Sequence, residues 1–485
     1  MECRPPASKF RLPLKSLSFR NFKPLQKVTK VVTRNPSVTD SPAHKEYIGY
    51  RGSDRTMSSM QPMLQFLKTD PLSGPVQRPQ TLVGMDVRAA IFEDLALKIL
   101  YLSGSLSILE LAEKTRLSFE VANELFFKMR AEQFCQVTGM AGNIPHIAIT
   151  SNGRNRAMEL LSHSHYAGVA PVSLESYVKQ ARNQGVQNVV VRPNDVERAF
   201  THLVLDDKTL QQLGTALNSG SAIFLYGPPG TGKTTIAAAL SRVLAEDAVW
   251  IPHAVEVDGQ IITVYDPAIH KRAPELEPQE RDERWVLCHR PAVLVGGELT
   301  VDMLDLQFNP ITKFYVGPVQ MKANNGVLII DDFGRQRLRP EELLNRWVVP
   351  LDRRIDFLTL AGGKKIEIPF EMLVVFASNI DPATLVDAAF LRRIQTKIKI
   401  GTVTDEAFCE IFRRYARDNG VGTEPDICNY LIDFIRTSLN QELRSCYPRD
   451  IVNQVCWAAR YEGVKPHLDR PALMRAVEAY FLPKA

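Results

Sequence analysis

The sequence lacks any apolar run long enough to cross a membrane and any cysteine pattern typical of a disulfide framework. No uninterrupted apolar stretch approaches the roughly 18 residues that a membrane-spanning helix needs. The seven cysteines are an odd number without a Cys-x2-Cys pair, which favours reduced thiols over a set of disulfides. His163 and His165 have no second pair of ligands at zinc spacing. These absences predict a cytoplasmic protein without a membrane span or a structural zinc site.

A strong charge of one sign is missing from most of the chain. The formal net charge is +5, but residues 1–56 hold 12 Lys and Arg against 4 Asp and Glu, and the remainder holds 47 against 50. The basic character therefore belongs to the N-terminal tail. An apolar content of 45% and a charged content of 23% are typical of a globular protein, and the 485 residues suffice for about three domains.

Residues 1–80 are rich in Pro, Ser, Lys and Arg and show no sustained periodicity, which predicts a mostly disordered basic tail. An Arg- and Ser-rich start with few acids is also typical of an organelle transit peptide. Its charge alone would suit a nucleic acid or an anionic lipid surface. A further alternative is that translation begins at Met57 or Met60.

The most informative stretch lies between an apolar run at 222–226 and a helical run at 235–244. It has the Gly-x4-Gly-Lys-Thr spacing of a phosphate-binding loop between a strand and a helix, and it consists of Gly227, Pro228, Pro229, Gly230, Thr231, Gly232, Lys233, Thr234 and Thr235. Glycines let backbone N–H groups curl around phosphate oxygens. Lys233 would bring positive charge to the β- and γ-phosphates, and the Thr234 hydroxyl can bind Mg²⁺. The loop therefore predicts a site for ATP and Mg²⁺.

Two further apolar runs end in polar side chains. Residues 326–330 lead into Asp331 and Asp332, and residues 372–378 lead into Asn379. Because ligands of parallel α/β sheets bind at the carboxyl ends of the strands, we expect these side chains near the phosphate-binding loop. Asp331 would hold Mg²⁺ directly or through water, and Asp332 would orient and deprotonate the attacking water. Asn379 would hold that water or the γ-phosphate.

Together these motifs resemble the AAA+ ATPases over roughly residues 190–485. A predicted hairpin of residues 355–360 and 365–368 around a Gly362-Gly363 turn is similar to the pre-sensor-1 hairpin clade, and residues 317–345, 350–354 and 368–370 look most like MoxR-type ATPases. The resemblance implies an α/β P-loop core at 196–401 and a helical lid at 402–485. We expect the lid helices at 405–419, 426–439, 450–461 and 470–482.

The same resemblance implies a ring, usually a hexamer, in which a neighbouring subunit supplies an arginine finger. Arg393 matches that position best and Arg392 is the alternative. Arg449, at the start of a lid helix, matches the second sensor. The alternative interpretations are a pair of arginines that balances a helix dipole and ordinary helix capping around Pro448-Arg449-Asp450.

The chain departs from the family in two ways. Most members have Asp-Glu in place of Asp331-Asp332, and the shorter acid lies about one methylene farther from the water, which predicts slow hydrolysis. Asp-Asp also occurs in the replication-initiator and helicase-loader clade, which lacks the hairpin.

The 98 positions between Lys233 and Asp331 also exceed what the core needs, and they include a hairpin-like segment at 254–265 and a charged loop at 271–284. The stretch 315–317 is similar to a pore loop, although we favour a plain turn.

Residues 81–165 predict an α+β unit that resembles a winged helix, with helices at 87–102, 107–117, 119–134 and 152–161 and a hairpin of 136–138 with 147–149. Residues 81–170 hold 8 Lys and Arg against 9 Asp and Glu, and we expect Glu120, Glu124 and Glu132 to be exposed. DNA phosphates need a basic face, so we favour a protein-binding unit over a DNA-binding one. Residues 166–195 are expected to be a linker with one helix at 174–183 and an extended segment at 186–191.

The sequence as a whole predicts an AAA+ ATPase that couples ATP hydrolysis to remodelling of, or chaperone-like action on, a protein partner. One alternative is a DNA-acting regulatory or replication ATPase that uses the winged helix. A second alternative is a nucleotide-switched scaffold that binds ATP with little turnover.

Overall fold

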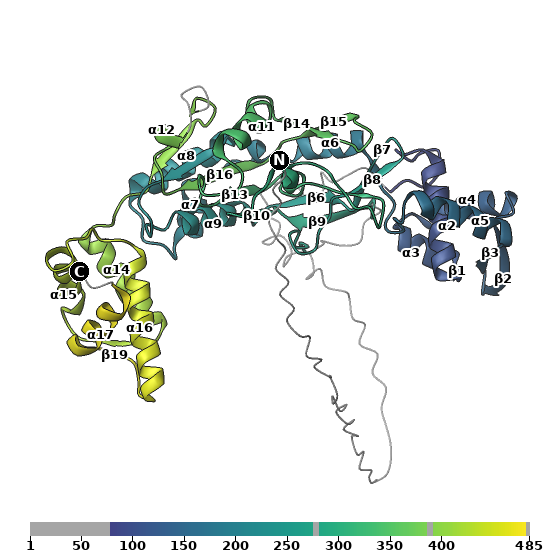
Figure 1. Cartoon of the computed structure of the whole chain (residues 1–485). Coiled ribbons are helices and arrows are strands. Elements are labelled where there is room, and N and C mark those ends of the chain that lie inside the picture. The colour runs from purple at the N-terminus through teal and green to yellow at the C-terminus, as the bar shows by residue number, and fades with distance from the viewer. Residues whose placement is uncertain (1–77, 275–280, 386–390, 482–485) are drawn as a thin grey trace, which may run out of the picture. The chain divides into compact units, whose positions relative to one another are not determined.

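A five-stranded parallel sheet forms the centre of the structure, a computed structural model that describes residues 78–274, 281–385 and 391–481. The strand order is β10-β13-β16-β5-β17, and β10, β13 and β16 are labelled in Figure 1. The strands are β5 (Ile223–Tyr226), β10 (Ala292–Val295), β13 (Val327–Ile330), β16 (Leu373–Ser378) and β17 (Thr396–Lys399). All neighbours pair in parallel. The prediction of a parallel sheet is therefore confirmed, whereas the predicted tail lies almost wholly outside the described residues.

Alternating side chains on these strands enter two separate cores. Ile223 and Leu225 of β5 pack on one face of the sheet, whereas Phe224 packs on the other. The strands β13 and β16 divide in the same way, because successive side chains of a strand point to opposite faces. A sheet covered on both faces needs continuous apolar strands, which explains the uninterrupted apolar runs in the sequence.

Helices cover both faces of the sheet. The first core contains side chains of α7 (Pro193–Phe200), α8 (Asp207–Ser219) and α9 (Lys233–Leu244). The second contains side chains of α11 (Pro340–Arg353), including the fully buried Trp347. Short helices α10 (Val319–Lys322) and α12 (Pro382–Leu385) lie in the connections. The predicted hairpin before β16 is present as β14 (Ile355–Thr359) paired antiparallel with β15 (Lys365–Pro369).

The segment between α9 and β13 folds into strands that the sequence analysis found only in part. The expected hairpin is present as β7 (Ala254–Val257) and β8 (Gln260–Thr263), joined by a turn in which Asp258 and Gly259 have φ of 51° and 80°. A second pair, β6 (Ala248–Pro252) and β9 (Trp285–His289), was not predicted. The remaining elements are η2 (Val301–Leu304), β11 (Gln307–Phe308) and β12 (Tyr315–Val316).

The expectation of a turn or a pore loop at residues 315–317 is wrong. Tyr315 is only 3% exposed, it belongs to a strand that pairs with β8, and its hydroxyl accepts a hydrogen bond from Ala361 N at 2.8 Å, so it forms neither a plain turn nor an exposed pore loop. The described parts of the predicted charged loop, 271–274 and 281–284, lie outside regular helices and strands, as expected. Its Arg284 is buried, with 3% of the residue exposed, and forms ion pairs with Asp282 and Asp86 at 2.7 Å. Residues 275–280 of that loop lie outside the described residues.

Residues 166–195 are packed although we expected a linker. They contain β4 (Val172–Ser173), which pairs with β7, and the helix α6 (Leu174–Asn183) at its predicted place. The expected extended segment begins with a 3-10 turn, η1 (Val186–Asn188). Tyr166, Tyr177 and Val189 are buried.

Residues 81–165 form an α+β unit whose helices lie close to their predicted places. The helices are α2 (Ala89–Ser103), α3 (Ile108–Thr115), α4 (Phe119–Ala131) and α5 (Ser151–His163), and the hairpin is β2 (Cys135–Ala141) with β3 (Ile144–Ile149). A third strand, β1 (Ser105–Ser107), was missed. Its last residue, Ser107, also caps α3 through a capping box with Glu110, so the sequence pattern at this point indicates the start of a helix. Glu124 is half-buried and accepts a hydrogen bond from Leu82 N at 2.9 Å, contrary to the exposed position that we expected.

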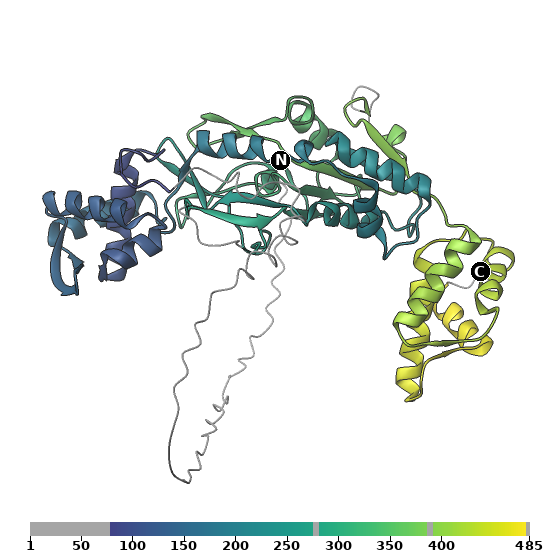
Figure 2. The ribbon, with the colours of Figure 1, turned by 180° about the vertical axis from the view of Figure 1, so that it is seen from behind.

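Residues 404–481 form a helical region with a core of its own, and both views show its helices gathered together (Figure 1 and Figure 2, yellow-green to yellow). They are α14 (Asp405–Asp418), α15 (Ile427–Thr437), α16 (Cys446–Glu462) and α17 (Arg470–Tyr480), with a small parallel pair of β18 (Gly422–Thr423) and β19 (His467–Leu468). Cys409 and Cys428 form a disulfide, so the expectation of reduced cysteines is wrong for this pair. Among the described residues, no helix has both the length and the apolar character that crossing a bilayer requires.

A buried ion pair connects the segments at the amino end of the central sheet. Arg290 Nε donates to Asp247 Oδ2 at 2.7 Å, and both side chains are at most 1% exposed. The same guanidinium donates to Gln184 O at 2.8 Å and to Asn325 O at 2.7 Å. A charge that is buried at this depth depends on its counter-charge.

Asp247→Ala should lower the free energy of unfolding by about 3–5 kcal/mol, because it leaves the guanidinium of Arg290 buried without its carboxylate. Urea unfolding followed by tryptophan fluorescence measures the loss. The matched control is Glu159→Ala, which removes an exposed partner of Arg156 and should leave the unfolding curve unchanged. Equal curves for the two variants would contradict the importance of the buried pair.

Candidate functional site

The predicted phosphate-binding loop connects β5 to α9 at the carboxyl edge of the sheet. Gly227, Gly230 and Gly232 have φ of 146°, 77° and 88°, which residues with a side chain rarely adopt. A Cβ atom on Gly227 would lie 2.1 Å from Ile400 O, so the loop passes directly against the end of β17. The glycine spacing is thus required by the local backbone. This strand–loop–helix at the edge of a parallel sheet is the fold of a P-loop NTPase.

Lys233 begins α9 and its side chain folds back over the loop. Its Nζ donates to Gly227 O at 3.1 Å and to Pro228 O at 2.8 Å, and the residue is only 7% exposed. Burial lowers the pKa of the Lys233 ammonium, and the nearby carboxylates of Asp331 and Asp332 partly oppose that shift. Of the other loop residues, Thr231 donates its hydroxyl to Pro228 O at 3.0 Å.

Thr234 and Asp331 face each other across the edge of the sheet. The Thr234 hydroxyl lies 2.9 Å from each of the two carboxylate oxygens of Asp331. Thr234 lies on the first turn of α9 and Asp331 directly follows β13, so the two come from elements that are 97 positions apart in the sequence. A hydroxyl and a carboxylate are oxygen donors, the kind of ligand that Mg²⁺ prefers.

Asp332 and Asn379 form the second pair. Asn379 Nδ2 donates to Asp332 Oδ1 at 2.9 Å. Asp332 has φ of 48°, in the left-handed region where Asp and Asn are the commonest residues after glycine. The predicted acids and the predicted amide therefore lie together at one edge of the sheet, next to the loop.

Arg392 and Arg393 follow the residues 386–390, which the structure does not describe. Arg393 Nε donates to Asp352 Oδ2 at 2.9 Å, near the end of α11, whereas Arg392 is exposed. Arg449 is exposed and its guanidinium pairs with Asp450 at 2.8 Å. Its helix α16 begins beside the loop, because Cys446 N and Ser445 Oγ donate to Gly230 O at 3.1 and 3.2 Å.

The sequence analysis missed two polar residues that shape this site. Gln336 Nε2 donates to Asp331 O at 3.0 Å, and its Oε1 accepts from Gly334 N at 3.1 Å, which fixes the turn after the acids. Ser378 lies directly before Asn379 and is fully buried. A small hydroxyl at the end of a buried strand was the only signal for it, and a single sequence gives no reason to select that hydroxyl over others.

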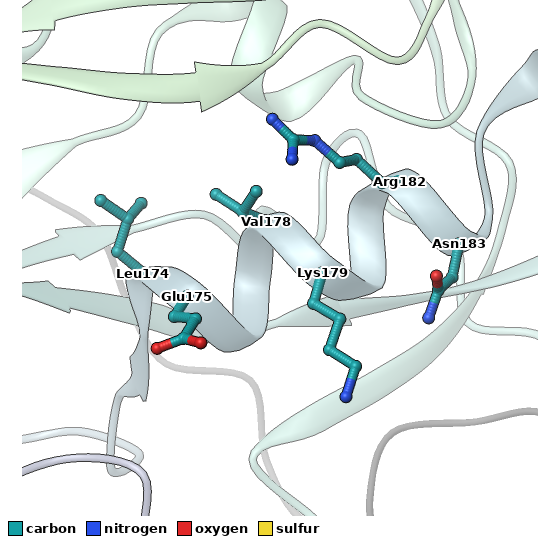
Figure 3. A pocket seen from close by; sticks show the side chains of 6 residues that line it. All are labelled: Leu174, Glu175, Val178, Lys179, Arg182 and Asn183. Carbon is teal, nitrogen blue, oxygen red and sulfur yellow. The ribbon is translucent and has the colours of Figure 1, made fainter.

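An open groove lies elsewhere, along the outer side of α6. In Figure 3 the apolar Leu174 and Val178 point to the same side of the helix as Arg182, whereas Glu175, Lys179 and Asn183 point away from them. None of the residues predicted to bind nucleotide lines this groove. Within the described ranges, no group of three or more His, Cys, Asp or Glu side chains has the arrangement of a metal site.

Comparisons with known proteins give limited matches. A family model described as a domain of unknown function (DUF8689) matches residues 404–479, which lie in the helical C-terminal region. No curated protein matches the chain. The chain is similar to the RuvB Holliday junction branch migration motor of Thermotoga maritima, with 15% identity, a TM-score of 0.35, and coverage of 57% of this chain and 70% of that chain. It is also similar to a mutant of that RuvB, with 14% identity, a TM-score of 0.34, and coverage of 61% and 72%.

Gly227→Ala should abolish the predicted nucleotide binding, because the added methyl group would lie 2.1 Å from Ile400 O and φ of 146° is strained for alanine. Binding of a fluorescent ATP analogue measures this loss. Gly139→Ala is the matched control, since a Cβ at that position has no neighbour within 4 Å. The geometric argument is contradicted if the loop variant binds the analogue as tightly as the control does.

Proposed function

We propose that this chain is an AAA+ ATPase that hydrolyses Mg²⁺-ATP at the loop of residues 227–235. The observation that carries the proposal is the convergence of Thr234, Asp331 and Asp332 at the strand edge that also bears Lys233. An ammonium, a hydroxyl and two carboxylates at the start of a helix are the groups that a metal–triphosphate needs.

The residues fit both Mg²⁺ and a triphosphate. Asp331 and Thr234 supply oxygen donors, and Asp331 would hold the ion directly or through water. When bound, Mg²⁺ neutralises charge on the β- and γ-phosphate oxygens. The glycine turns leave room for phosphate oxygens beside the backbone, and the N-terminus of α9 favours their negative charge. The Lys233 ammonium, which now contacts two loop carbonyls, would turn to the phosphates.

Asp332 is the general base of the proposed reaction. Its Oδ1 accepts the amide of Asn379, so Oδ2 is the oxygen that would orient the attacking water and take its proton. The bond to Asn379 also limits rotation of the carboxylate. A fixed carboxylate orients water better than a mobile one, so this bond would offset part of the slow hydrolysis that the shorter side chain of Asp predicts.

A neighbouring copy would complete the site with an arginine. Arg393, held beside α11 by Asp352, is the first candidate and the exposed Arg392 is the second. A guanidinium that reaches the γ-phosphate of the next subunit stabilises the charge of the transition state. The proposal therefore includes a homo-oligomeric ring, with a hexamer as the expected size, and a lid at 402–485 in which Arg449 responds to the nucleotide.

The proposed client is a protein, recognised by the winged-helix-like unit at 81–165. Glu120 and Glu132 on and beside α4 are exposed, and Phe127 of the same helix is 56% exposed. The hairpin of β2 and β3 contains no Lys, Arg, Asp or Glu. Lys128 and Arg130 of α4 are exposed as well, so the exposed charges on and beside this helix balance and give it no basic face. An uncharged hairpin beside such a helix, with an exposed aromatic ring, suits a protein surface better than DNA phosphates.

Steady-state ATP turnover and binding of an ATP analogue together test the proposal. The wild type should hydrolyse ATP. Asp332→Asn should keep analogue binding and lose turnover by at least about 100-fold, since an amide cannot accept the proton. Asp332→Glu should also be slower than the wild type, because Glu is poorly suited to φ of 48° and its longer side chain displaces the carboxylate from Asn379.

The other outcomes separate the alternatives. Tight binding without turnover in the wild type would contradict hydrolysis and support the nucleotide-switched scaffold. Strong stimulation of turnover by duplex DNA, lost at high salt, would support the DNA-acting alternative. Faster turnover of Asp332→Glu would contradict the role that we give to the left-handed backbone.

A further inference from the structure

A single buried hydroxyl joins the two loops that carry Asp332 and Asn379. Ser378 is the last residue of β16 and is 0% exposed. Its Oγ donates to Phe333 O at 2.6 Å and accepts from Ile380 N at 3.1 Å. Phe333 directly follows Asp332, and Ile380 directly follows Asn379. The hydroxyl therefore connects the residues next to both members of the candidate catalytic pair.

Besides the hydrogen bond that its carbonyl accepts from Ser378, Phe333 is held by its backbone N–H and by its buried ring. Its N–H donates to Ala377 O at 2.8 Å, and its side chain is 1% exposed. Its ring contacts those of Phe224 and Phe376, with centroid distances of 5.9 and 5.0 Å. Both backbone groups and the side chain of Phe333 are thus bound to β16 or to the core beneath it.

This anchoring explains how Asp332 keeps its unusual backbone conformation. A residue in the left-handed region stays there only where its surroundings fix it. On one side Asp331 is tied to Thr234 through its carboxylate, and on the other side Phe333 is held by Ser378 and Ala377. Between these two points Asp332 directs its carboxylate to Asn379.

We infer that Ser378 is a positioning residue for the Asp332–Asn379 pair and that its hydroxyl sets the distance between the base and the amide. The inference rests on the proposed function, because the pair acts only if the chain hydrolyses ATP. Ser378 itself is fully buried and its hydroxyl is engaged by backbone groups, so it acts through its two neighbours.

Removal of the hydroxyl tests the inference. Ser378→Ala should lower kcat for ATP by at least about ten-fold, since small displacements of reacting groups have large effects on rate. KM and the affinity for an ATP analogue should stay at the wild-type values, because the loop and Lys233 are untouched. Ser378→Thr retains a hydroxyl and should recover most of the rate. Ser378→Cys fills the same space with a weak donor and should remain slow.

Thr115→Ala is the matched control. Thr115 is also 0% exposed, and its hydroxyl donates to a backbone carbonyl, Leu111 O, at 2.7 Å in α3. It should leave kcat unchanged. A wild-type kcat in Ser378→Ala would overturn the inference, and so would a parallel loss of analogue affinity, because that result would indicate a general structural role.

Hydrogen exchange separates failure of the inference from failure of the proposed function. If the wild type shows no turnover, the proposed ATPase is contradicted. The hydrogen bonds of the Ser378 hydroxyl to Phe333 O and Ile380 N still predict faster exchange of the Phe333 amide in Ser378→Ala than in the wild type. Unchanged exchange at Phe333 would overturn the positioning role whether or not the chain hydrolyses ATP.

Discussion

The parallel pairing of β16 between β5 and β13 is the constraint on which the candidate site depends. Tyr226 of β5 lies opposite Ser378 of β16, and Ile330 of β13 lies opposite Phe376. This register brings the start of the predicted phosphate-binding loop, the amide of Asn379 and the two acids after Ile330 to one level. A slip of a single residue in β16 would turn its side chains to the opposite faces and remove Asn379 from Asp332.

The candidate site lies on regular strands and a regular helix, but two of its residues have an unusual backbone conformation or an unusual degree of burial. The strands and α9 follow the rules of a covered parallel sheet, whereas Asp332 adopts a left-handed backbone and Lys233 is buried with its pKa lowered by desolvation. Such exceptions persist where the surrounding packing fixes them, and they often mark functional positions. Here the aromatic rings of Phe224, Phe333 and Phe376 supply that packing directly below the acids.

The sequence predicted the parts of the structure that depend on local patterns. The loop of residues 227–235, the strands that end at Asp331 and Asn379, the hairpin at 355–368 and most helices were identified from short motifs or periodicity. The sequence analysis missed the pairing of β6 with β9, the burial of Arg284 and the disulfide of Cys409 with Cys428. Each of these depends on residues that lie far apart in the sequence, and for such pairs a single sequence carries no signal of proximity. The roles of Arg393 and Arg449 remain predictions, because they depend on a neighbouring copy and on bound nucleotide.

The most direct test of the central claim is a structure of the full chain determined with Mg²⁺ and a non-hydrolysable ATP analogue. The account predicts the triphosphate against the backbone of residues 227–235, with Lys233 at the phosphates, Mg²⁺ beside Thr234 and Asp331, and an arginine from a neighbouring copy at the γ-phosphate. A nucleotide bound elsewhere, or a loop that stays empty at saturating analogue, would contradict it.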